Sequence, residues 1–224
     1  MSTIVDYNSL VSALQNATED DGTEVLDYIP TAIQLAEERM TKEIDTFGLL
    51  INVNVSGSSM NRLITKPTDY RFAYNVIYRT SANSEEVPLR KRTQEFCRDY
   101  WPFANVSGAT PKYYADYSPT QFLIAPTPDA DCIFTLSYGA KPASLSSNVS
   151  TNYFIDWFPD ALFYCSMIEL CRFQRNLESS GAYEQAYVNT MQGANNQGRR
   201  ERRDSNIDPK NPEQAVNSFK PEGN

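Results

Sequence analysis

The chain has 224 residues, of which 41% are hydrophobic and 12% aromatic, and its formal net charge is −8. This length and apolar content suit one or two folded domains and do not fit a disordered or collagen-like chain. Histidine is absent, which removes the usual general base of serine and cysteine triads and the commonest zinc ligand. The composition therefore disfavours much ordinary enzymology.

The cysteines and the apolar runs bear on the compartment of the protein. Four cysteines show no Cys-x-x-Cys spacing, and three lie within apolar runs, so we expect buried free thiols at Cys97, Cys132, Cys165 and Cys171. The first seventeen residues lack the basic region of a secretory signal. No apolar run reaches the ~20 residues that span a bilayer. We expect a soluble protein that folds in the cytoplasm.

Charge is concentrated at the beginning of the chain. Residues 1–46 hold ten acidic and two basic residues, which equals the whole net charge of −8. This segment has helical apolar spacing over residues 9–17, then an acidic turn around Gly22, then a second helix that we expect to begin near Pro30 and to end near residues 47–48. Ile33, Ala36, Met40 and Ile44 form the apolar stripe of the second helix.

From residue 49 to about 138 the sequence changes to short segments rich in Val, Ile, Tyr, Phe and Thr, separated by Gly, Pro, Asn and Ser. This pattern predicts strands. The expected strands are 49–55, 62–65, 72–80, 112–118, 121–125 and 132–139, and the segments 112–118 and 121–125 have the pattern of a hairpin. Residues 92–100 predict a short helix.

After residue 141 the helical pattern returns. A short helix over 152–158 should stop before Pro159, because the residue that precedes a proline disfavours helical geometry. The next helix, 160–173, is apolar nearly all round and should be buried. A last helix is expected after a break at Gly181. The helical pattern fades over residues 193–203, so the sequence does not fix the C-terminal end of this helix.

The last segment, residues 204–224, contains three prolines and few apolar side chains, so it cannot form a core of its own. It is either disordered or ordered by a partner, and Ile207 and Phe219 are the side chains that could dock. Together the patterns predict an α+β fold, in which N- and C-terminal helices form a bundle around an inserted antiparallel β-rich region. The expected boundaries are 1–48, 49–140, 141–203 and the extended tail 204–224.

The order of several segments carries a family resemblance. IQLAEERMTKEID is followed by KPTDYRFAYNVIYRT, then PKYYADYS, QFLIAPTPD, LSSNVSTNYF, WFPDALFY and finally AYEQAYVNTMQ before RRERR. In this order, from about residue 29 to 203, the chain resembles the head-to-tail adaptor proteins of short-tailed bacteriophages, also called connector or tail tubular proteins.

The resemblance implies a structural virion protein without catalysis or cofactor. About twelve copies would form a ring at the head-tail junction, beneath the portal protein ring, and would extend the DNA channel to the tail nozzle protein, with tail fibres as possible further partners. The helices would face the portal, the β-rich insertion would face the tail, and the tail 204–224 would reach into the portal. DNA would pass through without specific binding.

Two charged clusters are candidate sites within this scheme. A portal contact is expected at Arg199, Arg200, Arg202 and Arg203, together with Ile207 and Phe219 of the tail. Those arginines could also bind nucleic acid, but they would neutralise only ~4 phosphates, which is weak binding at physiological salt. Channel-facing acids are expected at Glu19, Asp20, Asp21 and Glu24, with an ordinary solvated surface as the alternative.

A second function class is a carbohydrate- or receptor-binding accessory protein of the tail. The chain has fourteen tyrosines, and Tyr113, Tyr114 and Tyr117 lie close together in sequence. Aromatic faces can bind sugars, although tyrosines that alternate in strands more often pack within a sheet. The sequence predicts no catalytic set, no metal site and no cofactor.

Overall fold

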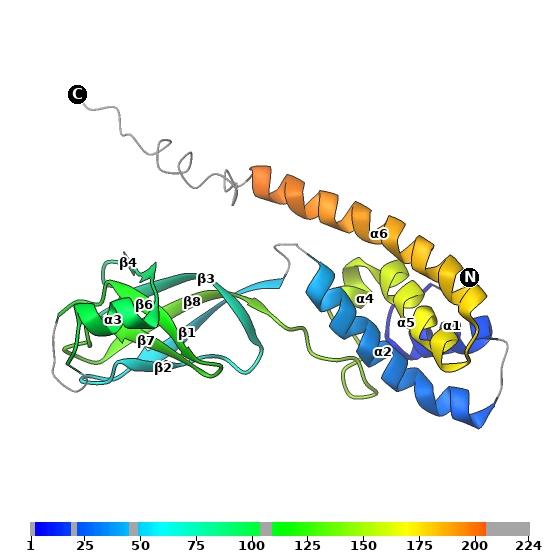
Figure 1. The fold of residues 1–224 in the computed structure, drawn as a ribbon, viewed down its shortest axis with the longest axis horizontal. Helices are drawn as coiled ribbons and strands as arrows, with labels where there is room; N and C mark the ends of the chain where they lie inside the picture. Colours follow the sequence, from blue (N-terminus) through cyan, green and yellow to red (C-terminus); the bar gives the residue numbers. More distant parts are fainter. Residues whose placement is uncertain (1–2, 19–21, 45–48, 104–108, 205–224) are drawn as a thin grey trace. The chain divides into compact units, whose positions relative to one another are not determined.

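The computed structural model describes residues 3–18, 22–44, 49–103 and 109–204, and for residues 197–204 it describes the backbone alone. The chain divides into two compact units, one made of residues 1–48 and 142–224 and the other of residues 49–141 (Figure 1). We call them the helical unit and the β unit. The helices of the first and the two sheets of the second confirm the predicted α+β class.

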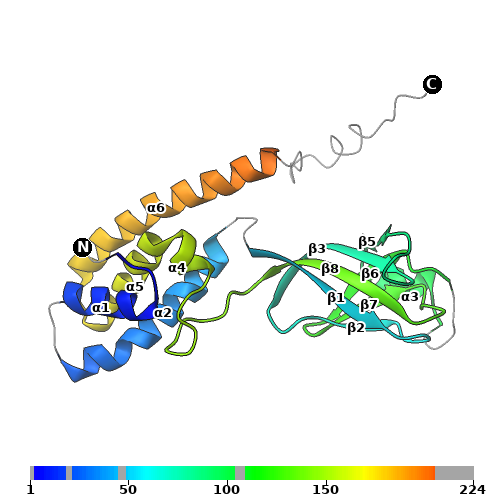
Figure 2. The ribbon, with the colours of Figure 1, turned by 180° about the vertical axis from the view of Figure 1, so that it is seen from behind.

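The helical unit is built around one buried helix. Its helices are α1 (Tyr7–Thr18), α2 (Thr23–Glu43), α4 (Tyr153–Trp157), α5 (Pro159–Phe173) and α6 (Leu177–Asp204). α5 packs against all four of the others, as both views show (Figures 1 and 2). Its buried side chains include Leu162, Cys165, Ile168 and Leu170, which confirms the buried helix predicted there.

Local signals explain where several helices begin. α1 starts with a reciprocal cap, in which the amide of Ser9 donates to Asp6 Oδ1 (2.8 Å) and the amide of Asp6 donates to Ser9 Oγ (2.9 Å). Asn152 caps α4 by accepting hydrogen bonds from the amides of Phe154 and Ile155. α4 stops before Pro159, as predicted, and Pro159 occupies the first turn of α5, where its missing N–H costs little.

Two helix boundaries differ from the prediction. α2 begins at Thr23, so Pro30 lies inside the helix and not at its start, and α2 ends at Glu43 with Ile44 as its cap. Buried apolar residues on both sides of Pro30, such as Val25, Ile29 and Ile33, hold the helix together despite the lost backbone hydrogen bond. The predicted end at residues 47–48 lies outside the described residues.

The last helix is also longer than predicted. α6 runs from Leu177 to Asp204 and passes through Gly181 and Gly193 without a break. A glycine costs roughly 1 kcal/mol in a helix, and packing of Tyr187, Met191 and Ala194 into the core outweighs that cost. The prediction failed because it treated a weak local preference as decisive.

Among its described residues, the β unit contains two four-stranded sheets and the short helix α3 (Gln94–Tyr100). The first sheet has the order β1 (Leu50–Gly57), β8 (Cys132–Ala140), β3 (Tyr70–Arg79), β4 (Val87–Pro88). The second has the order β2 (Leu63–Thr65), β7 (Gln121–Ala125), β6 (Tyr113–Ser118), β5 (Arg90–Lys91). The β6–β7 hairpin confirms the predicted pairing. All pairings are antiparallel except β5 with β6, which is parallel.

The core of the β unit follows from strand alternation. On β8, Cys132, Phe134, Leu136 and Tyr138 are buried, while the residues between them are half-exposed. Helix α3 (Gln94–Tyr100) packs on β6 and β7, with Cys97 buried beneath it. All four cysteines are buried and free, as predicted. Burial raises the thiol pKa of Cys132 to about 11 and that of Cys165 to about 12.

Candidate interaction surfaces

The four arginines predicted to contact a portal lie on the C-terminal end of α6. Asn195 Nδ2 donates a hydrogen bond to the carbonyl of Glu43, the last residue of α2 (3.4 Å). The nine residues of α6 beyond Asn195 therefore extend roughly 13 Å past the end of α2, at 1.5 Å per residue (Figure 1). This extension carries positions 199, 200, 202 and 203, whose side chains are not among the described ones.

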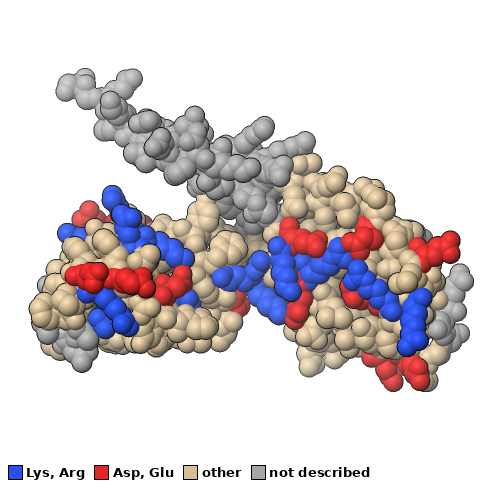
Figure 3. Space-filling view, in the orientation of Figure 1, with Lys and Arg blue, Asp and Glu red and all other residues tan. Residues whose placement is uncertain are grey.

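The acidic and tail positions are described only in part. Glu24 is exposed in the first turn of α2, where a negative charge suits the helix dipole. The other predicted positions, Glu19, Asp20, Asp21, Ile207 and Phe219, lie outside the described residues. On the face shown in Figure 3, basic and acidic side chains of the helical unit lie next to one another. That face is therefore not uniformly acidic.

An ion-pair cluster joins α2 to α6. Arg39 Nε donates to Glu43 Oε1 (3.0 Å), and Arg39 Nη1 donates to Glu184 Oε2 (3.0 Å), with a second contact from Nη2 to Glu184 Oε1. The guanidinium also lies over the ring of Tyr187, 4.6 Å from its centroid, and the hydroxyl of Tyr187 donates to Glu43 Oε2 (2.6 Å). The fork of Arg39 thus fixes the register between two helices far apart in sequence.

The electrostatics of this cluster favour its charged form. The hydrogen bonds from Arg39 lower the pKa of Glu184, with a smaller contribution from the charge of Arg172, and the hydrogen bond to Glu184 raises the pKa of Arg39. Burial, together with the hydrogen bond to Glu43, raises the pKa of Tyr187, so its hydroxyl stays protonated. The arrangement can hold helices in place, and all its charges have partners within the cluster.

A buried carboxylate of α2 binds the segment 143–152, which precedes α4. Glu37 of α2 is only 3% exposed, and its Oε1 accepts from the amide of Leu145 (3.0 Å) and from Asn152 Nδ2 (2.6 Å). Asn152 Nδ2 also donates to the carbonyl of Ala143 (2.9 Å). One carboxylate thus ties residues 143–152 to α2 while the same asparagine caps α4.

Aromatic side chains gather on α3 of the β unit. Phe96 and Tyr100 are 39% and 43% exposed, and their rings lie nearly parallel with centroids 6.0 Å apart. Both contact the ring of Tyr113 edge-on, at 5.1 and 5.0 Å. Arg92 lies over Phe96 at 5.5 Å. We call these four residues the aromatic platform.

The platform overlaps only partly with the tyrosines singled out in the sequence. Tyr113 belongs to it, and Tyr117 is 40% exposed, but Tyr114 is 4% exposed in the sheet core and is thus in the wrong place for a ligand contact. Alternation along β6 explains why neighbouring tyrosines take opposite sides. In the sequence, Phe96 and Tyr100 show only the i, i+4 spacing of one helix face. This spacing does not indicate that Tyr113 contacts them.

No group of three or more His, Cys, Asp or Glu side chains is close enough to hold a metal ion among the described residues. Within the same residues, no helix is long and apolar enough to cross a bilayer.

Comparison with known sequences assigns the chain to a family. No curated protein sequence matches it significantly. The sequence model of the SU10 adaptor protein family matches residues 5–211, a range that includes helices and strands of both units and all of α6. Because this match covers most of the 224 residues, the chain belongs to the SU10 adaptor protein family.

Proposed function

We propose that this chain is a structural virion protein of a short-tailed bacteriophage, a head-to-tail adaptor that acts by assembly and not by catalysis. About twelve copies form a ring that joins the portal protein to the tail nozzle and continues the DNA channel. The observation that carries this proposal is the family match, which extends over both units and α6.

The portal contact is proposed for the end of α6 and the residues after it. The helix continues past the end of α2, beyond Tyr187, Met191 and Ala194, which pack into the core. Helix geometry places positions 199, 200, 202 and 203 within roughly 160° of the circumference. Four arginines on one side of a projecting helix suit an acidic rim on the portal, and Ile207 and Phe219 are proposed to anchor the following segment.

The acidic N-terminal segment is proposed to face the channel. Affinity for DNA grows with the number of phosphates that a protein neutralises, so a conduit wall works best without a basic lining. Glu24 is exposed and follows Glu19, Asp20 and Asp21 in the sequence. A ring of about twelve such segments would repel DNA and let it pass.

The test combines the purified full-length chain with the portal ring of the same phage and measures the mass of the complex by native mass spectrometry. The full chain should add about twelve copies. A chain that ends at Asp204 keeps every described residue and should remain folded by circular dichroism, but it should fail to bind. Full binding by this shortened chain would contradict the role of Ile207 and Phe219, and no binding by the full chain would contradict the adaptor function.

A carbohydrate- or receptor-binding accessory protein is the second candidate, and the exposed aromatic platform is the observation that favours it. Parallel exposed rings such as Phe96 and Tyr100 offer a surface on which a sugar ring can stack. A glycan array with the full chain tests it. Specific binding that Tyr100→Ala abolishes and Tyr117→Ala preserves would favour this function, whereas no binding would leave the platform as the packing of α3 on its sheet.

A further inference from the structure

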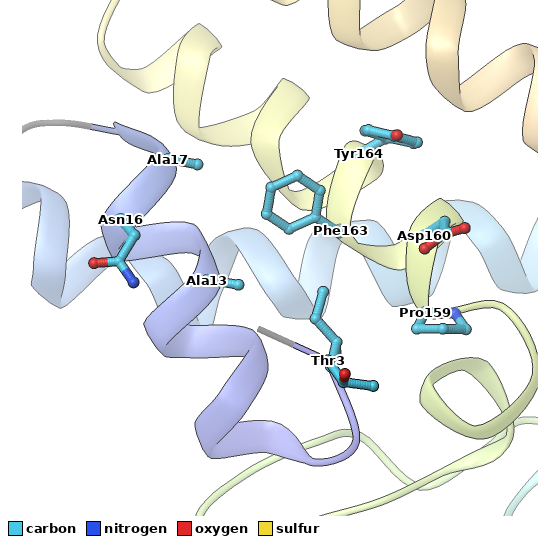
Figure 4. Close-up of a pocket in the computed structure, with 9 residues that line it drawn as sticks. Thr3, Ala13, Asn16, Ala17, Pro159, Asp160, Phe163 and Tyr164 are labelled. Atoms are coloured by element: carbon cyan, nitrogen blue, oxygen red, sulfur yellow. The ribbon is translucent and has the colours of Figure 1, made fainter. Parts of the chain in front are cut away.

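The helical unit has a pocket at the N-terminal end of α5. It has a volume of about 680 Å³, within the range of roughly 300–1,000 Å³ that binding pockets occupy. Ala13 and Ala17 of α1 face Phe163 of α5 across it (Figure 4). Ile4 and Pro159 add further apolar surface, and Asp160 lies at its edge. The pocket therefore suits an apolar side chain next to a positive charge.

The same unit presents an apolar projection at the other end of α5. Phe173, the last residue of α5, is 42% exposed and stacks on Tyr28 of α2 with ring centroids 4.2 Å apart. Leu177, the first residue of α6, is 76% exposed, the highest value among the large hydrophobic side chains described. We call Tyr28, Phe173 and Leu177 the apolar knob. The turn between α5 and α6 thus exposes two large apolar side chains four residues apart, and exposed apolar surface of this kind marks contact surfaces.

The knob and the pocket are separated by the length of α5. From Pro159 to Phe173 the helix rises roughly 21 Å, at 1.5 Å per residue. The two surfaces therefore lie at opposite ends of α5, and the knob of one copy cannot reach the pocket of the same copy. A contact between different patches on two copies is heterologous, and it closes into a ring when the rotation between copies fits.

The charges beside the knob are mixed, since Asp27 and Glu178 are exposed there, but one basic side chain matches the acidic side chains near the pocket. Arg175 is exposed in the turn between Phe173 and Leu177. Asp160 lines the pocket, and Asp156 is exposed on the preceding short helix, α4. Complementary charges of this kind orient a contact and exclude wrong pairings more than they add affinity.

We propose that the apolar knob of one copy occupies the α1–α5 pocket of the next copy, and that this contact links the copies into the ring. The inference rests on the proposed adaptor function, since it specifies which surfaces of the chain meet there. Leu177 enters between Ala13 and Phe163, Phe173 covers the rim, and Arg175 pairs with the carboxylates at Asp156 and Asp160.

Cross-linking tests the contact directly. A chain with both Leu177→Cys and Ala13→Cys is assembled with the portal ring and treated with a short bis-maleimide. Covalent dimers, trimers and larger species up to the ring are expected by denaturing electrophoresis. Either single variant should give no such ladder, because the four native thiols are buried and react poorly. A ring that assembles without any ladder in the double variant would overturn the proposal.

A second pair of variants measures how much the apolar knob contributes to ring formation. Leu177→Asp changes an exposed side chain, so the monomer should remain folded, and ring formation should need a concentration about tenfold higher or more. The control is Met60→Asp in the β unit, which is 55% exposed and has a positive φ of 61° that aspartate tolerates. Equal ring formation by Leu177→Asp and wild type would contradict the knob.

The two proposals fail in different ways. If wild type does not add copies to the portal, the adaptor function is wrong and no ladder can be expected. If wild type forms the ring but the cysteine pair does not cross-link and Leu177→Asp assembles normally, the ring stands and the copies meet through other surfaces.

Discussion

The helical unit and the β unit differ in how far apart in sequence their stabilising contacts lie. The β unit is one continuous segment. Among its described side-chain hydrogen bonds, the one that joins the residues furthest apart in sequence runs from Ser137 to Asn52, which are 85 residues apart. The helical unit is made of two segments, so its contacts between Glu37 and Asn152 and between Arg39 and Glu184 span 115 and 145 residues.

The two units also use different chemistry for these contacts. Asn52 and Asn54 of β1 accept from the hydroxyls of Ser137 and Thr135, a row of uncharged pairs on the outer side of the first sheet. The helical unit uses buried or half-buried charges. Long loops cost entropy to close, and charge-assisted hydrogen bonds are stronger than neutral ones. The most distant segments of the helical unit are thus joined by charge-assisted hydrogen bonds, whereas the β unit forms its pair between the buried Lys66 and Asp116 (2.8 Å) over a shorter span of 50 residues.

The largest expected effect comes from removing a hydrogen bond that joins the two segments of the helical unit. Asn152→Ala removes the cap of α4 and two hydrogen bonds, one of them to the buried carboxylate of Glu37. The variant should lose about 2–4 kcal/mol of unfolding free energy, measured by urea denaturation. Asn148→Ala, an exposed residue of the same segment, is the control and should change little. Equal stability of the two variants would show that the hydrogen bond from Asn152 to Glu37 does not stabilise the fold.

A smaller effect is expected from steric change in the β unit. A Cβ at Gly57 would overlap the ring of Phe134, which is fully buried and cannot move, so Gly57→Ala should cost about 1–3 kcal/mol. At Gly139 the added Cβ would meet the ring of Phe72, which is 52% exposed and free to turn. Gly139→Ala should therefore cost clearly less. Denaturation curves of both variants test this, and the reverse order would mean that the first sheet shifts as a whole.

The smallest effect is the pH dependence of the ion pair between α2 and α6. The folded-state pKa of Glu184 lies below its ordinary value of 4.5, so its stabilising contribution is fully present above that pH and is lost as the pH falls through the lowered pKa. Glu184→Gln should lower the melting temperature at pH 7 by a few degrees at most, because the carboxylate is partly exposed. The difference from wild type should narrow below pH 4.5.

A matched variant separates this effect from the general acid sensitivity of the fold. Glu85→Gln changes a carboxylate that is exposed outside the helices and strands of the β unit. The melting temperature of this control should equal that of wild type at pH 7 and at pH 3. A constant gap between wild type and Glu184→Gln from pH 7 to pH 3 would mean that Arg39 contributes through packing and not through charge.

Patterns of short range were enough to predict much of the fold. Alternation identified β8 and the β6–β7 hairpin, and the apolar character of residues 160–173 identified the buried helix. The same patterns misplaced the start of α2 at Pro30 and broke α6 at Gly181, because tertiary packing outweighs one unfavourable residue. The two-residue strands β4 and β5 are too short to leave a periodic signal.

The candidate surfaces were harder to predict than the fold. Arg39 and Glu43 have helical spacing, yet nothing in the sequence indicates that Glu184 joins them. The pocket and the apolar knob each combine residues from separate helices, and only the packing of α1, α2 and α6 on α5 brings them together. Charge runs such as Arg199 to Arg203 are visible in any sequence, but their placement beyond the end of α2 is not.

The chain leaves and re-enters the helical unit through adjacent strands. Leu50, the first residue of β1, lies opposite Gly139 near the end of β8, so the two crossings are about 5 Å apart at their Cα atoms. A gap of this size can be closed by a short turn. The β unit is therefore a cassette inserted into the helical unit, and the chain enters and leaves this cassette at the same end of one pair of strands.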